Sequence, residues 1–479
     1  MSQSIEKEGS IRTNVTDEKR PFGLRDKIGY MFGDFGNDFS FIFASSYLMV
    51  FYTKVLGISG AAVGTLFLAA RVLDAFTDVT MGRIVDSIQP VKDGRFRPWI
   101  RRMCIPVAVS STIMYFHFIS DWSYGAKMVY VIITYLLWSS FCYTAINIPY
   151  GSMASVISAK AGDRAALSTY RGVGASLASL VIGTVVPLIV YETDAAGNQI
   201  VIPARFTLTA VAFGIAAVIC YALCYFLCVE RITFQKKENA KKEGVGKMLR
   251  ELAGNRPLLA LVCAALVLLL ASLLGQTMNN YLFLDYFRNA KAIVILNIVM
   301  VVVMLLMAPF VSRIATSIGK KEAGAWGMLS SGIVYLALFF LRIKSIPVFI
   351  ILFFVGTIGV GLFNMIVWAF ITDIIDYQEV VTGKREDGTV YAIYSFARKV
   401  GQALAGGLGG FALTAIGYIS DAPAQTAEVS ERIYTVATLI PGVCYLIVFA
   451  VMQFWYPLSK AEVEKNGKIL QEKREGSVE

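Results

Sequence analysis

Apolar residues fill most of the chain in long blocks, which short polar stretches separate. A helix of about 20 apolar residues crosses the ~30 Å hydrocarbon core of a bilayer. The pattern therefore predicts an all-α membrane protein with twelve membrane-spanning helices. We expect these spans at residues 28–52, 60–86, 99–119, 126–150, 168–191, 205–229, 257–284, 289–314, 322–342, 345–372, 388–418 and 433–456.

The longest polar interruption divides these spans into two sets of six. It contains eight Lys and Arg residues and predicts a cytoplasmic central loop at residues 230–256. An N-terminal six-helix bundle is expected at residues 28–229 and a C-terminal one at 257–456. Residues 1–27 and 457–479 are expected to form cytoplasmic tails.

The basic residues of the loops indicate which side of the membrane each loop faces. The loop after the second span contains Lys92, Arg95, Arg97, Arg101 and Arg102, whereas the next loop has a single lysine. Lys and Arg accumulate in cytoplasmic loops. Both termini are therefore expected in the cytoplasm, with the protein in the cell (inner) membrane. The N-terminal tail lacks the apolar segment of a cleavable signal peptide.

A weak internal repeat relates the two halves. "GRIVDSI" ends the second span and "SRIATSI" ends the eighth, 230 residues later, with Arg, Ile, Ser and Ile in common. Parallel repeats of this kind are typical of transporters. The same offset places Met304 opposite Asp74 and Ala308 opposite Asp78. An acidic pair is therefore present in the first half only.

Composition excludes several functional classes. Hydrophobic residues make up 56% of the chain and charged residues 16%, against about a quarter charged in soluble proteins. The net charge of +10 is explained by the cytoplasmic loops, and no basic stripe with interleaved aromatic residues indicates nucleic acid. The sequence has one His and no HExxH, GxSxG or Cys/His cluster, so we expect no enzyme, no metal site and no bound cofactor.

Asp74 and Asp78 lie in the middle of the second predicted span. An ionised side chain at that depth costs ~2.5–3.5 kcal/mol on insertion scales, so such residues face a bundle interior or a water-filled cavity. The two acids are one turn apart, and two bare carboxylates ~6 Å apart repel by roughly 3 kcal/mol. A proton, a sodium ion or Arg71 would relieve this repulsion. An ion pathway is the favoured interpretation, and a buried ion pair that locks helices together is the alternative.

Other predicted spans contain isolated polar groups. The fourth has a polar face next to Pro149, and the fifth has a single base, Arg171. Arg398 and Lys399 of span eleven face a cavity if they are deep, or extend to the membrane surface if they are shallow. Asn279 and Asn280 of span seven suit either a hydroxylated ligand or hydrogen bonds between helices.

Several stretches together resemble the glycoside–pentoside–hexuronide:cation symporter family of the major facilitator superfamily. They are "GYMFGDFGNDF", "RVLDAFTDVTMGRIVDS" with "GRFRPW", "NIPYGSM", "ITDIIDYQE" and "RKVGQA". The family includes melibiose and glucuronide permeases. The resemblance covers residues 28–456 and implies two six-helix bundles around a central cavity that works by alternating access.

The resemblance, together with the polar groups of the predicted spans, indicates roles for individual residues. The cation site is expected at Asp74, Thr77, Asp78 and Asn147. Substrate contacts are expected at Asp38, Tyr143, Thr144, Asn147, Arg171, Asn279, Asn280, Ser395, Arg398 and Lys399. Gating charges are expected at Arg83, Asp86, Arg95, Arg97, Asp373, Asp376 and Arg385.

Three positions depart from the melibiose-type pattern. That pattern has an acid at Asn147, an asparagine at Thr77 and a tryptophan at Gly151. Fewer oxygen ligands and one less negative charge make a poorer sodium site, whereas a proton needs only one carboxylate of suitable pKa. The missing acid also makes the cavity less hostile to an anionic sugar. The sequence therefore predicts a proton-coupled importer of a glucuronide or related hexuronide.

Two alternatives remain open at this point. One is a sodium-coupled importer of a neutral glycoside or pentoside, such as a xyloside, galactoside or glucoside. The other is a lysolipid carrier, against which the polar face of span four argues. The expected partners are the sugar, the coupling cation and the lipid bilayer, and the chain is expected to act as a monomer.

Overall fold

A computed structural model describes residues 14–15, 20–158, 160–195, 199–233, 254–383, 390, 393–394, 397–398, 400–402, 405, 407–420, 422 and 424–475. Helices dominate these residues, and ten helical segments among them are long and apolar enough to span a bilayer. The predicted first span is the continuous helical segment formed by α1, η1 and η2. Part of the eleventh span is described and includes α14 (Leu408–Ala415).

The first half of the chain forms the elements α1 (Leu24–Phe43), η1 (Ala44–Leu48), η2 (Phe51–Val55), α2 (Gly60–Ser87), α3 (Arg97–Ile113), η3 (His117–Ile119), α4 (Tyr124–Leu136), η4 (Leu137–Tyr143), α5 (Thr144–Ile157), α6 (Ala161–Val190) and α7 (Pro203–Leu227). Two short antiparallel pairs join β1 (Asn14–Val15) to β4 (Ile232–Thr233) and β2 (Tyr191–Thr193) to β3 (Gln199–Val201). The helices α1, α3, α6 and α7 pack on one another.

The second half forms α9 (Arg256–Tyr281), η5 (Leu282–Tyr286), η6 (Ala290–Ala292), α10 (Ile293–Ser317), α11 (Lys320–Leu341), α12 (Ile346–Thr382), α14, α15 (Ala427–Ala450), η7 (Val451–Trp455) and α16 (Lys460–Glu475). Here α11 packs against α12 and α15, and α15 packs against α9. Between the halves, α2 packs against α14 and α6 against α10.

Several helices extend beyond the boundaries expected from the sequence, and α6 begins at Ala161, before the expected residue 168. The helix α12 continues to Thr382, past the expected end at residue 372, and α5 continues to Ile157, past residue 150. The predicted C-terminal tail contains α16, which was not expected. Leu470 of α16 is buried and α16 packs against α12, so tertiary packing extends helical structure beyond the apolar spans.

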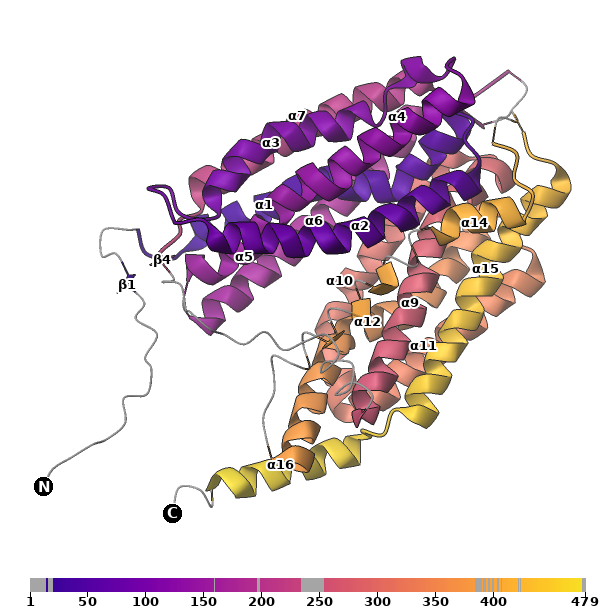
Figure 1. Cartoon of the computed structure of the whole chain (residues 1–479). Coiled ribbons are helices and arrows are strands. Elements are labelled where there is room, and N and C mark those ends of the chain that lie inside the picture. The colour runs from indigo at the N-terminus through magenta and orange to yellow at the C-terminus, as the bar shows by residue number, and fades with distance from the viewer. Residues whose placement is uncertain are drawn as a thin grey trace, which may run out of the picture.

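β1 and α16, near the two ends of the described chain, lie on the same side of the molecule, which we call the tail side (Figure 1). Figure 1 also shows that the two sets of helices meet away from the termini and diverge toward the tail side. The ends of α7 and α10 lie on the tail side, as the contacts of Arg20 with Leu227 and of Lys460 with Ser317 indicate. The turn after α2 lies there too, since the backbone N–H of Arg95 donates to Glu230 just after α7.

Candidate functional site

The acidic pair of α2 meets hydroxyl groups of the fourth span. The Asp74 carboxylate accepts hydrogen bonds from Ser139 Oγ and Ser140 Oγ, both at 2.6 Å. Asp78 Oδ1 accepts one from Thr144 Oγ1 at 2.9 Å. Arg71 Nη1 lies 3.5 Å from Asp74 Oδ2, within ion-pair distance. Asp74 is thus held by two hydroxyl groups of the fourth span together with the arginine of its own helix.

A π-helical segment positions these hydroxyl groups. η4 separates α4 from α5 within one continuous span. Such segments shift the register of a helix by one residue per turn and are frequent at functional sites. Ser139 and Ser140 belong to η4, and Thr144 begins α5. The shift allows two adjacent serines to reach the same carboxylate from consecutive positions.

The other two predicted cation ligands contribute less in this structure. Thr77 Oγ1 donates to the backbone oxygen of Asp74 on its own helix, at 3.1 Å. Asn147 is half-buried, and its side chain makes no hydrogen bond within the described part of the chain. Their roles in cation binding stay predictions.

Arg171 forms an ion pair that the sequence did not predict. Its Nε donates to Asp34 Oδ1 at 2.8 Å, and the guanidinium carbon lies 5.5 Å from the centre of the Tyr150 ring. The Asp34 side chain is 7% exposed, whereas that of Arg171 is 43% exposed. Among the described residues, the terminal nitrogens of Arg171 have no hydrogen-bond partner. Asp34 therefore holds the guanidinium from one side and leaves its outer fork accessible.

Aromatic rings pack next to Arg71, the neighbour of Asp74. Tyr143 stacks on Phe41 with ring centres 5.5 Å apart and also contacts Trp138. The guanidinium of Arg71 lies 5.3 Å from the centre of the Phe41 ring. Asp38 follows Asn37 on α1 and is half-buried. The residues predicted from span one, span four and span five are thus brought to one region of the first half.

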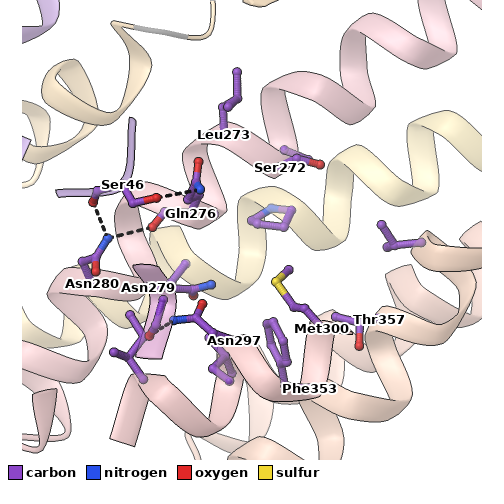
Figure 2. Close-up of a pocket in the computed structure, with 18 of the residues that line it drawn as sticks. Ser46, Ser272, Leu273, Gln276, Asn279, Asn280, Asn297, Met300, Phe353 and Thr357 are labelled. Atoms are coloured by element: carbon purple, nitrogen blue, oxygen red, sulfur yellow. Dashed lines mark hydrogen bonds between the residues drawn. The ribbon is translucent and has the colours of Figure 1, made fainter. Parts of the chain in front are cut away.

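Two cavities adjoin this region. The smaller, of about 160 Å³, is lined by residues that include Phe41, Arg71, Tyr135, Trp138 and Gln276. The larger, of about 270 Å³, lies mainly in the second half, and Asn279, Asn280 and Asn297 are among its lining residues (Figure 2). Ile42, Leu273 and Gln276 line both cavities, so the two adjoin across α1 and α9.

Comparison with known proteins decides the family. Residues 29–460 match the family model described as MFS/sugar transport protein. The chain is 32% identical to a glucuronide carrier protein homolog of Escherichia coli (strain K12), over 94% of this chain and 97% of that protein. It is 29% identical to a putative glycoside/cation symporter of the same organism, over 92% of this chain and 93% of the relative.

The chain belongs to the MFS/sugar transport family. Within that family its relatives are glycoside–pentoside–hexuronide:cation symporters, as the sequence motifs predicted. The solved structure of the xylose transporter XylE from E. coli, in an inward open conformation, aligns with a TM-score of 0.57 at 12% identity, covering 93% of this chain and 98% of XylE. This likeness confirms the predicted all-α major-facilitator fold. The chain is accordingly a multi-pass membrane transporter and not an enzyme.

The predicted gating residues of this MFS transporter make contacts inside their own halves. Arg97 donates to the backbone oxygen of Tyr225 at 2.7 Å and stacks on its ring. Asp373 pairs with Lys320 at 2.6 Å. The backbone N–H of Arg95 donates to Glu230, and Arg83 is exposed. In the described part of the tail side, these contacts do not join the two halves.

Some predicted residues receive no structural account. Arg385, Ser395 and Lys399 lie outside the described residues, as does the side chain of Asp86. Asp376 is half-buried on α12, and Arg398 contacts the buried Tyr394. Their roles stay predictions.

The side opposite the tails is closed by contacts between the halves. Lys54 Nζ lies 3.2 Å from Asp285 Oδ1, and both side chains are less than 10% exposed. Tyr418 Oη donates to Asp285 Oδ2 at 2.9 Å, and Thr53 Oγ1 lies 2.8 Å from Tyr281 Oη. These residues connect the first span to spans seven and eleven.

Glycines bring α2 and the eleventh span into backbone contact on this same side. A Cβ atom on Gly60 would lie 2.8 Å from the Gly410 oxygen, and one on Gly64 would lie 2.6 Å from the Gly407 oxygen. Only glycine fits at so close an approach. The transporter is thus sealed at the end opposite its tails.

Proposed function

We infer that the protein is a proton-coupled symporter that imports a glucuronide or related hexuronide by alternating access. The observation that carries this proposal is the side-by-side placement of Asp74 and Asp78 on α2, each held by hydroxyl groups of the fourth span. Intramembrane carboxylates of this kind mark ion pathways. The family membership supplies the coarser conclusion that the chain carries a sugar or glycoside.

The outer fork of Arg171 supports an anionic sugar. Guanidinium groups bind carboxylates through two parallel hydrogen bonds, and these charge-assisted bonds are about twice as strong as neutral ones. Asp34 and the Tyr150 ring hold the guanidinium of Arg171 in a fixed orientation. Phe41 and Trp138 line the smaller cavity and provide aromatic surface for a pyranose ring.

The proposed cycle assigns the tail side to the cytoplasm. The seal between Lys54 and Asp285 then lies on the outer side, and the structure is inward-facing. In this cycle the bundles predicted at 28–229 and 257–456 rock about the central cavity. Binding of the cation neutralises charge in the cavity and strengthens sugar binding, and by linkage the sugar strengthens cation binding equally.

Sodium coupling to a neutral glycoside is the second candidate. Hydroxyl oxygens of Ser139, Ser140 and Thr144 lie beside the acidic pair, and oxygen ligands suit hard cations. Arg71 opposes any added positive charge at Asp74, whether a proton or sodium, so it does not separate the two ions. A proton needs fewer ligands than sodium, and the pattern offers fewer acids than the melibiose type. These considerations favour the proton.

Uptake by proteoliposomes tests both parts of the proposal. Radiolabelled methyl glucuronide should accumulate when the outside is acidic in sodium-free buffer, and a protonophore should abolish this accumulation. Methyl glucoside, galactoside and xyloside should accumulate less. A strict requirement for sodium would refute proton coupling, and a preference for a neutral sugar would refute the hexuronide assignment.

A further inference from the structure

The larger cavity has one polar end and one apolar end (Figure 2). Its polar end is formed by amide and hydroxyl groups of spans one, seven and eight. Its more apolar end is formed by residues of spans eight, ten and twelve, which include Met300, Phe353, Val360 and Pro441. The Thr357 hydroxyl at this end donates to the backbone oxygen of Phe354 on its own helix. None of the described lining residues is charged, so a carboxylate in this cavity would have no counter-charge.

The polar end contains a buried hydrogen-bond acceptor without a partner. Asn280 Nδ2 donates to the backbone oxygens of Ser46 and Gln276, at 2.8 Å and 3.1 Å. Asn280 is 3% exposed, and its Oδ1 is buried without a hydrogen-bond partner among the described residues. An unsatisfied buried acceptor costs about 1–3 kcal/mol. A ligand hydroxyl or N–H group would remove this cost.

Neighbouring side chains keep the amide groups in place. Gln276 donates to Ser46 Oγ at 3.0 Å, and Asn297 donates to the backbone oxygen of Gly183 at 2.8 Å. Gln276 and Ser46 belong to different halves, as do Asn297 and Gly183. The polar end is therefore assembled where the two halves meet, which is where an alternating-access carrier must hold its cargo.

The apolar end offers surface for a ring or an alkyl chain. Phe353 is 2% exposed and forms a wall, whereas Met300 is 50% exposed and borders the opening. Apolar surface removed from water contributes roughly 25 cal/mol per Å². The flexible thioether of Met300 adapts to ligands of different shape. This end of the cavity can therefore accommodate apolar groups of different shapes.

The two cavities adjoin at Gln276, and they differ in charge. The smaller one is lined by Arg71 and four aromatic side chains that suit a sugar ring, whereas none of the described residues that line the larger one is charged. A free monosaccharide would fill only one of them. A ligand with a sugar at one end and a less polar group at the other matches both.

We propose that the cavity lined by Asn280, Asn297, Phe353 and Val360 is a subsite for the aglycone, or second ring, of a glycoside whose sugar lies beside Arg71. This subsite rests on the proposed transport function and specifies its substrate as a conjugated glycoside and not a free sugar. Asn280 Oδ1 accepts a hydrogen bond from a hydroxyl or N–H group near the glycosidic bond. The apolar wall takes the remainder of the aglycone.

Paired ligands that share one sugar test this subsite. The dissociation constants of methyl and phenyl glycosides are measured with detergent-purified protein by calorimetry, for glucuronides first. The phenyl compound should bind about tenfold more tightly than the methyl compound, because its ring buries apolar area. Val360→Phe should remove most of this advantage by filling the apolar end, and should leave the affinity for the methyl compound within about twofold.

Val355→Phe is the matched control. Val355 lies on the same helix, does not line the cavity and is 44% exposed, so this variant should keep the tenfold advantage. Asn280→Leu should weaken phenyl compounds with a hydroxyl beside the glycosidic bond more than those without one. Equal affinities of the methyl and phenyl compounds in the native protein, or an unchanged advantage in Val360→Phe, would overturn the subsite.

Different results would refute the proposed transport function and the proposed subsite. If another sugar binds in place of glucuronides, the hexuronide assignment is wrong and the same methyl and phenyl pair of that sugar decides the subsite. If no glycoside binds, the transport proposal is refuted, and the subsite that rests on it is refuted too.

Discussion

The helices α2 and α10 occupy equivalent places in the two halves, yet their chemistry differs. α2 has Asp74 and Asp78, which meet the hydroxyl groups of Ser139, Ser140 and Thr144. α10 has Met304 and Ala308 at the corresponding positions, and its cavity-lining residues Asn297 and Met300 are neutral. One scaffold thus presents carboxylates in its first half and amide and apolar groups in its second.

This difference indicates a division of roles. A carrier that couples two cargoes needs the coupling ion to alter the affinity for the other cargo. In the proposed cycle, the acidic pair would keep the ion site on a single set of helices in the first half. The second half is then free to recognise uncharged parts of the substrate.

The largest expected effect follows from removing one carboxylate of the first half. Asp78→Asn should abolish accumulation against a gradient and bring the ratio of internal to external sugar to about one, because a neutral amide binds no coupling ion. Downhill counterflow should persist. Both quantities are measured in proteoliposomes. The control Asp121→Asn changes an exposed carboxylate and should transport normally; accumulation by Asp78→Asn would break the proposed division.

Arg171 should have the next largest effect, and on one substrate class only. Arg171→Gln should weaken glucuronide binding by about 10- to 100-fold, because a charge-assisted hydrogen bond contributes about 1.5–3 kcal/mol. The affinity for the matching glucoside should change little. Calorimetry on both sugars separates loss of a carboxylate contact from general misfolding. If the affinities for the glucuronide and the glucoside fell equally, Arg171 would have a structural role and not a role in binding the carboxylate.

Replacing a serine beside the acidic pair should have a smaller effect on transport than the two changes above, and a serine of the second half provides the comparison. Ser140→Ala removes a donor to Asp74 and should shift the half-saturating cation concentration of transport by about tenfold. Ser272→Ala, in the cavity of the second half, should leave that concentration unchanged. Initial rates of uptake are measured over a range of cation concentrations. A shift in both variants would show that ion binding is not confined to the first half.

The smallest effects concern two glutamates that connect helix ends. Glu230 accepts hydrogen bonds from the backbone N–H groups of Arg95, Phe96 and Arg97 at 2.7–2.8 Å. Glu322 of the second half accepts one from Lys460 N at 3.4 Å. Glu230→Gln should lower the free energy of unfolding by about 1–3 kcal/mol and Glu322→Gln by less. Thermal unfolding in detergent ranks them, and the reverse order would contradict the hydrogen-bond geometry.

The sequence predicted those features that depend on local pattern. Apolar blocks predicted the spans, and the spacing of Asp74 and Asp78 predicted that they share a helix face. Arg71 was predicted as a neighbour of Asp74 because it lies three residues earlier. These are relations between residues of one helix, which the helical repeat determines.

Features that depend on register shifts or on distant helices were missed. Ser139 and Ser140 reach Asp74 through the register shift of η4, which the sequence pattern does not predict. The only sequence feature that points to this contact is the pair of adjacent serines after Trp138. The Arg171–Asp34 and Lys54–Asp285 pairs join residues more than 130 positions apart. No spacing rule relates such residues, since their proximity is decided by how the helices pack.

The glycine contact between α2 and the eleventh span has a consequence for variation in this chain. At Gly60, Gly64, Gly407 and Gly410 the backbones touch without intervening side chains, so even one added methyl group would force the two halves apart on that side. An alanine at any of these positions would act as a wedge. It would favour the state that is open on the side opposite the tails, without contacting substrate or cation. Substitutions at these four glycines would therefore shift the equilibrium between the two access states.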